Sequence, residues 1–99
     1  MKHIILSADG DSTVYSVPDP VAEDLRKYLD IFFDWLYDGP GKDRYFDGWG
    51  FRFDERAFIE YLNTELFPDE VSAEVENIGF ISFESQVPPE YRGSPSFNF

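Results

Sequence analysis

Apolar residues repeat at helical spacing in the stretch that follows Pro18. Asp19 is a favourable N-cap, Pro20 suits the first helical position, and Gly39 can end the helix. The pattern therefore predicts one amphipathic helix of about 19 residues. Successive positions on its apolar face are four, four, three and four residues apart, and they are Val21, Leu25, Leu29, Phe32 and Leu36.

The first seventeen residues have the pattern of a β-hairpin. Residues 3–7 read as a strand, and residues 12–17 alternate polar and apolar side chains, several of them β-branched. Asp9-Gly10 lies between the two segments and is a favoured hairpin turn, in which this pair supplies the positive φ that the turn requires.

The rest of the chain predicts a second helix and further strands. Asp54 is a plausible N-cap for a helix over 55–66, and residues 49–53 are expected to include a short strand. Residues 70–78 fit either a helical or an alternating period, so both interpretations stay open. Residues 79–84 look like a strand. The proline-containing tail, residues 88–99, is expected to be irregular, with its aromatic side chains laid back onto the domain.

These elements predict an α+β fold, with two helices packed on a small, mostly antiparallel sheet that includes the N-terminal hairpin. The chain has 99 residues, about the length of one domain. We therefore expect a single acidic domain over residues 1–99. Aromatic residues make up 19% of the chain and can supply its core without disulfides.

The net charge of the chain limits the kinds of molecule that it is expected to bind. Twenty acidic and eight basic residues give a net charge of −12. This charge disfavours direct binding to nucleic acid or to an anionic membrane, because both need clustered Lys and Arg. It permits a basic protein partner. The chain has no Cys, which removes thiolate chemistry and leans towards the cytoplasm. The apolar run Ile4-Ile5-Leu6 is too short for a signal peptide or a membrane span.

One segment carries the pattern of a catalytic motif. Asp9-Gly10-Asp11-Ser12-Thr13-Val14 follows a hydrophobic strand and resembles the first motif of the haloacid-dehalogenase-like phosphohydrolases. The resemblance implies Asp9 as nucleophile and Asp11 as acid/base, with Mg²⁺ between carboxylate and phosphate. That family needs a parallel sheet with several βα units, which this chain is too short to build. A hairpin turn is the competing interpretation.

Two neighbouring segments are candidates for a binding surface. Asp30, Asp34 and Asp38 share one face of the first predicted helix, where they repel one another. The glycine-rich loop 39–50 follows that helix and contains aromatic side chains of the kind that anchor interfaces. The candidate aromatic residues in this loop are Tyr45, Phe46 and Trp49.

Three functional hypotheses follow. The first is a non-catalytic domain that binds a basic protein, for example as an inhibitor or an immunity-type protein whose acidic groups imitate a phosphate backbone. The second is a structural domain that self-associates as a homodimer through the hairpin edge or the aromatic loop. The third is a minimal divalent-cation-binding protein or hydrolase at Asp9 and Asp11. Under the first hypothesis we expect no catalytic residue, metal ligand or cofactor.

Overall fold

The predicted hairpin is present in the computed structural model, which describes residues 1–99. Strand β1 (Lys2–Ser7) pairs antiparallel with β2 (Ser12–Val17), with Ile4 opposite Tyr15. The residue with positive φ in the turn is Asp9, at 56°, and Gly10 does not adopt this conformation. Asp is one of the few residues other than glycine that visits this region readily.

Two later strands complete a four-stranded sheet in the order β3-β2-β1-β4. Strand β3 (Ala73–Gly79) pairs antiparallel with β2, so the alternating interpretation of residues 70–78 is the right one. Strand β4 (Ser96–Asn98) pairs parallel with β1. The prediction that the tail is irregular is therefore wrong at its end, where residues 96–98 join the sheet. The predicted α+β class, with two longer helices on a mostly antiparallel sheet, is confirmed.

The first predicted helix is divided in two. Helix α1 (Asp19–Glu23) ends at Asp24, whose φ of −146° and ψ of 62° leave the helical region, and α2 (Leu25–Asp38) begins directly after it. The break lets α1 bury Val21 while α2 turns to bury its own apolar face. The prediction that Asp19 caps the helix is wrong, because Pro18 takes the cap position and the Asp19 carboxylate pairs with the amino terminus at 3.0 Å.

The second predicted helix is present with a wider last turn. Helix α4 (Glu55–Tyr61) begins at the predicted cap, where the Asp54 carboxylate accepts a hydrogen bond from the backbone N–H of Arg56. It continues as a π-helical turn (Leu62–Leu66), in which the backbone N–H of Phe67 reaches the carbonyl of Leu62. The loop 39–50 contains an unpredicted short helix, α3 (Gly41–Tyr45).

The segment after β3 forms a layer of its own. The predicted strand over 79–84 is wrong, because Gly79 has a φ of 80° and turns the chain out of the sheet. Two short 3₁₀ turns follow (Glu84–Gln86 and Pro89–Tyr91). The expected strand over 49–53 is reduced to a single bridge between Phe46 and Phe51.

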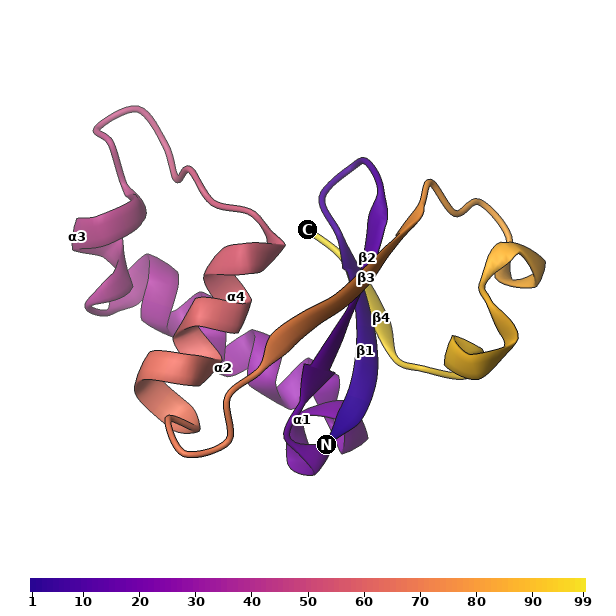
Figure 1. Ribbon diagram of the computed structural model, residues 1–99. Helices are drawn as coiled ribbons and strands as arrows, with labels where there is room; N and C mark the ends of the chain where they lie inside the picture. The colour runs from indigo at the N-terminus through magenta and orange to yellow at the C-terminus, as the bar shows by residue number, and fades with distance from the viewer.

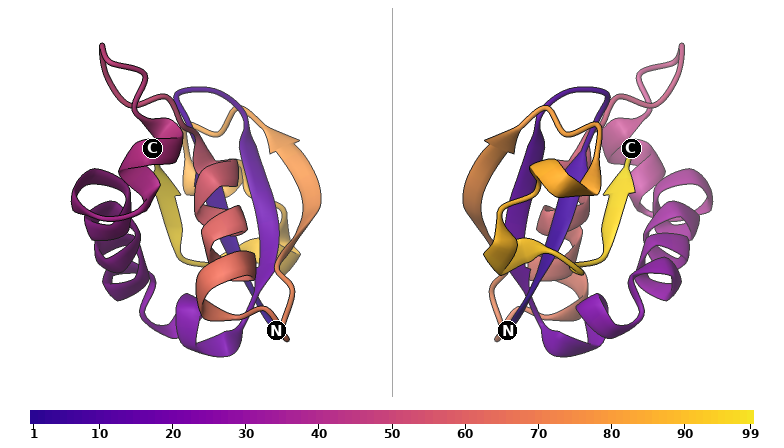
Figure 2. Two further views of the ribbon diagram at one scale, coloured as in Figure 1. Left: turned by 90° about the vertical axis from the view of Figure 1, so that its left-hand side faces the viewer. Right: turned by 90° about the vertical axis from the view of Figure 1, so that its right-hand side faces the viewer.

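The sheet lies between these two layers, with the helices on one face and the segment 80–95 on the other (Figures 1 and 2). Ile4 and Leu6 join the larger core under the helices, while Ile5 packs with Val87 and Tyr91 on the opposite face. Strand β1 is therefore apolar on both sides, which explains its unbroken apolar run.

None of the helices has both the length and the apolar character that crossing a membrane would need.

Phe32 lies at the centre of the larger core and is fully buried. Its ring centre lies 5.4 to 6.3 Å from those of the surrounding rings. These rings come from α2, from the chain before and within α4, and from the C-terminus, and they are Phe33, Trp35, Phe53, Phe58, Tyr61 and Phe99.

Replacing this central ring should leave a cavity that its neighbours cannot fill. We expect Phe32→Ala to lower the free energy of unfolding by about 3–5 kcal/mol, measured by urea denaturation. The matched control is Phe83→Ala, since Phe83 is largely exposed and should change stability little. Equal losses in the two variants would contradict this assignment of the core.

Candidate functional site

The loop between α3 and α4 forms a tight hairpin-like projection. Phe46 and Phe51 form an antiparallel bridge at its base. The backbone N–H of Asp47 donates to the Gly50 carbonyl at 3.1 Å, and the backbone N–H of Arg52 donates to the Tyr45 carbonyl at 2.9 Å. Gly48 has a φ of 95°, which favours glycine at this point of the turn. The loop extends away from the helices and the sheet (Figures 1 and 2).

The side chain of Asp47 holds this loop in shape. Its Oδ1 accepts hydrogen bonds from the backbone N–H groups of Trp49 and Gly50, at 2.9 and 3.0 Å. Its Oδ2 pairs with the guanidinium of Arg52. The bond from Arg52, followed by the two backbone bonds, lowers the pKa of the Asp47 carboxyl below its ordinary value. The carboxylate is therefore charged at neutral pH and fixes the loop backbone.

Trp49 lies in this loop and is 95% exposed. Phe46 and Tyr37 are each 42% exposed, and both pack on Phe51, with ring centres 5.2 and 4.6 Å from it. We call Tyr37, Phe46, Trp49 and Phe51 the aromatic ridge. Tyr37 comes from α2 and the other three residues from the loop, and Phe51 is partly buried beneath them. Exposed aromatic side chains such as Trp49, Phe46 and Tyr37 are the kind of apolar surface that marks an interaction site.

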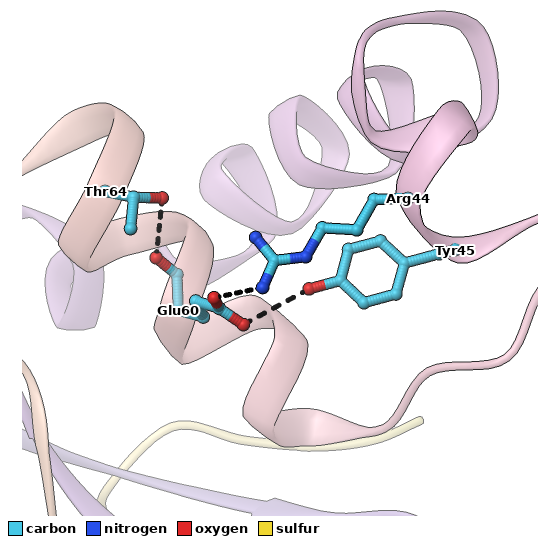
Figure 3. Close-up of polar contacts among 4 residues, drawn as sticks. All are labelled: Arg44, Tyr45, Glu60 and Thr64. Atoms are coloured by element: carbon cyan, nitrogen blue, oxygen red, sulfur yellow. Dashed lines mark hydrogen bonds and ion pairs between the residues drawn. The ribbon is translucent and has the colours of Figure 1, made fainter.

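Tyr45, the third aromatic residue predicted for binding, lies in the base of the loop. Its hydroxyl donates to Glu60 Oε2 at 3.3 Å, and its ring packs on Trp35 (Figure 3). The guanidinium of Arg44 pairs with the other oxygen of Glu60. Burial, followed by the nearby charge of Glu60, raises the pKa of Tyr45. The base of the loop is therefore fixed to α4, while Phe46 and Trp49 face solvent.

Close packing of α3 on α2 also fixes the base. A side chain at Gly41 would come within 2.6 Å of the Trp35 ring, so only glycine lets the two helices approach this closely. In the π-helical turn that follows α4, the Thr64 hydroxyl donates to the backbone carbonyl of Glu60 at 2.9 Å (Figure 3). Reasoning from the sequence took residues 39–50 for one loop and missed this support.

The predicted acidic face lies on the exposed side of α2, next to the loop. Asp30, Asp34 and Asp38 are all exposed. Asp30 pairs with Arg26 at 3.2 Å, whereas Asp34 and Asp38 make no ion pair within the chain. Helix α2 ends at Asp38, only a few residues before the helix that carries the aromatic loop. The two predicted segments are thus neighbours along the chain, with Asp38 at the end of α2 that leads to the loop.

Asp9 and Asp11 hold the hairpin turn against two different strands. The Asp9 carboxylate accepts a hydrogen bond from the side-chain NH₂ group of Asn98 at 2.9 Å. The side-chain oxygen of Asn98 in turn accepts from the backbone N–H of Asp9 at 2.8 Å. Asp11 accepts from the side chain of Asn77 in β3 at 3.3 Å. The structure contains no group of three or more His, Asp or Glu side chains placed to hold a metal ion. These contacts favour the hairpin-turn interpretation of the segment.

Replacing Asp47 should loosen the aromatic loop and leave the domain folded. We expect Asp47→Ala to lower the ¹⁵N heteronuclear NOE of Trp49 and Gly50, because both backbone N–H groups lose their acceptor. The matched control is Asp43→Ala, at an exposed carboxylate of α3 outside every ion pair. An unchanged NOE in Asp47→Ala would show that other contacts fix the loop.

Acid should loosen the same loop in the wild-type protein. The folded-state pKa of Asp47 is lowered, so the carboxylate stabilises the loop fully above the ordinary value of 3.8 and loses this effect as the pH falls through the folded-state pKa. The NOE of Gly50 should therefore be constant from pH 7 to about pH 5 and decrease only below the ordinary carboxyl pKa. A decrease between pH 5 and 7 would assign the effect to another group.

Likeness to known proteins assigns no function to these residues. Comparison of the chain with models of protein families, with curated proteins and with solved structures finds no match.

Proposed function

We propose that this protein is a non-catalytic binding domain whose aromatic ridge contacts a basic protein. The observation that carries the proposal is the 95% exposure of Trp49 on a loop that Asp47 holds in shape. Exposed aromatic rings gain free energy when a partner removes them from water, and tryptophan is among the commonest hot-spot residues. A loop that is already ordered loses little conformational entropy on binding.

The partner is expected to be basic because of the charge around the ridge. The chain carries a net charge of −12, and Asp34 and Asp38 make no ion pair on α2, the helix that precedes the loop in the chain. Such a field speeds the encounter with a basic surface and repels nucleic acid. An inhibitor or immunity-type protein is one concrete form of this role, in which carboxylates occupy a site for phosphate groups. We place this binding in the cytoplasm, in keeping with a chain that folds without disulfides.

Capture from a lysate of the source cell would test the proposal. Tagged wild type and Trp49→Ala are compared at low and at high salt, and bound proteins are identified by mass spectrometry. We expect one basic protein on the wild type at low salt and its loss at high salt. Trp49→Ala should weaken binding by about 2 kcal/mol or more, roughly thirtyfold in Kd, mainly through faster dissociation.

The matched control for this experiment is Phe80→Ala, which removes an exposed ring elsewhere on the molecule. It should bind the partner as the wild type does. The proposal fails if no basic partner is captured, or if Trp49→Ala and Phe80→Ala bind it equally well.

Self-association is the second candidate function. The predicted route through the hairpin edge is wrong, because β1 and β2 are the inner strands of the sheet, but the edge strand β3 can take its place. Val71, Val75 and Phe80 lie in or beside this strand and are all exposed. Unpaired backbone groups along such an edge can accept a strand from a second copy. Two copies of charge −12 repel each other, so a dimer should form more readily at high salt. Sedimentation velocity at low and high salt tests this, and a monomer under both conditions would exclude it.

A further inference from the structure

A pocket of about 180 Å³ lies between the sheet and the segment 80–95, which covers the face of the sheet opposite the helices (Figure 2). Strands β1, β2 and β4 form its floor, and side chains between 81 and 94 form its roof. At roughly 30 Å³ for each water molecule it has room for six of them, so a ligand that fills it is small. None of the residues that line it belongs to the aromatic ridge.

The roof of this pocket is held in place by its own hydrogen bonds. The side-chain oxygen of Gln86 accepts from the backbone N–H groups of Ser82 and Phe83, at 2.6 and 3.0 Å. The guanidinium of Arg92 donates to the backbone carbonyl of Val87 at 2.9 Å. The Val87 side chain in turn packs in the smaller core, against the sheet. A ligand therefore meets a pocket that is already formed and loses little free energy to ordering it.

The hydroxyl of Ser12, on the floor of this pocket, has no partner within the protein. Ser12 is 8% exposed, and its side chain makes no hydrogen bond to another residue. The one fully enclosed side-chain atom without a partner is Ser72 Oγ, so the Ser12 oxygen is open to the pocket that it lines. A buried hydroxyl costs stability unless it is hydrogen bonded. This hydroxyl can be satisfied only by a molecule in the pocket.

The other polar groups of the pocket are mostly hydroxyls as well. Ser94 and Ser96 line it, and neither side chain is hydrogen bonded within the chain. Ser7 donates to Asn98 at 3.0 Å, which leaves the Ser7 oxygen free to accept. Glu84 supplies the one charge in the lining, and its Oε2 accepts no hydrogen bond from the chain. The pocket thus offers groups that both donate and accept, one carboxylate and no cation.

We propose that this pocket binds a small neutral polyol, such as a monosaccharide. Each hydroxyl of a polyol both donates and accepts, so it satisfies a serine hydroxyl whichever way that hydroxyl is turned. The C–H surface of the ligand covers Ile5 and Val87, the apolar part of the lining. The free oxygen of Glu84 accepts a charge-assisted hydrogen bond from one ligand hydroxyl.

Charged ligands fit the same lining less well. An anion finds no cation in the pocket and meets the carboxylate of Glu84. An ammonium ion would pair with Glu84, but it has no acceptor for the hydrogen atoms of the serine hydroxyls. The inference does not depend on the proposed function, because the pocket and Trp49 lie on separate surfaces.

Titration of the isolated protein with glucose, galactose, ribose and myo-inositol tests the site. We expect at least one of these polyols to bind with a Kd on the order of a few millimolar. In ¹H–¹⁵N spectra, the amide signals of Ser12, Ile81 and Ser94 should move most. If none of the four moves these signals at concentrations up to about 100 mM, well above that Kd, the pocket holds water alone and the proposal is overturned.

Ser12→Ala tests the hydroxyl on which the argument depends. It should weaken polyol binding roughly fivefold, the effect of one lost hydrogen bond. Its urea midpoint should not decrease, because the hydroxyl makes no bond within the chain. The matched control is Ser16→Ala, on the same strand but outside the pocket, which should bind as the wild type does. Unchanged binding in Ser12→Ala, or an equal loss in both variants, would contradict the proposed site.

Two charged probes, ethylammonium and inorganic phosphate, test the class of ligand. Neither should compete with a bound polyol for the pocket. Glu84→Gln keeps an oxygen that can accept, so it should weaken polyol binding by only about threefold. If ethylammonium displaces the polyol and Glu84→Gln abolishes this displacement, the pocket is a cation site and the proposed ligand is wrong. Trp49→Ala should bind polyols as the wild type does, and a loss there would contradict the separation of the two surfaces.

Discussion

Burial of the Phe32 ring is the interaction on which the rest of the structure depends. The ring meets side chains from α2, from α4 and from the C-terminal residue Phe99, so three parts of the chain share one apolar contact region. Each part alone is a short amphipathic element that would be marginal in water. The same contact keeps the end of the chain beside β1, where β4 completes the sheet.

That core also positions the surface that we propose for binding. Trp35 follows Phe32 along α2, and its ring supports Tyr45 at the base of the aromatic loop. The loop therefore stands on a fixed support, although it is itself in solvent. The proposed binding surface is therefore a consequence of how the helices are held.

Elements with strong local signals were predictable from the sequence. The alternating strands around Asp9-Gly10, the Asp54 cap and the end of α2 at Gly39 are set by residues next to one another. The break at Asp24 was not predictable, because the apolar spacing continues through it and only tertiary packing turns the chain. The parallel pairing of β4 with β1 joins residues about ninety positions apart, a separation at which no local pattern operates.

The candidate site, too, could be predicted from the sequence only in part. Glycines and aromatic residues mark the loop in the sequence, but the inward position of Tyr45 depends on Glu60 and Trp35, which are ten to fifteen residues away. The acidic residues give no such guide, because they are so frequent in this chain that no pair of them stands out in the sequence.

The most direct measurement of the central claim is the environment of Trp49 in the complex. In a Trp35→Phe background, Trp49 is the only tryptophan, so its fluorescence reports on this one side chain. The account predicts water-exposed emission and easy quenching by acrylamide in the free protein. A captured basic partner should then shift the emission to shorter wavelength and protect the ring from the quencher. A stable complex in which Trp49 stays fully quenchable would contradict the account.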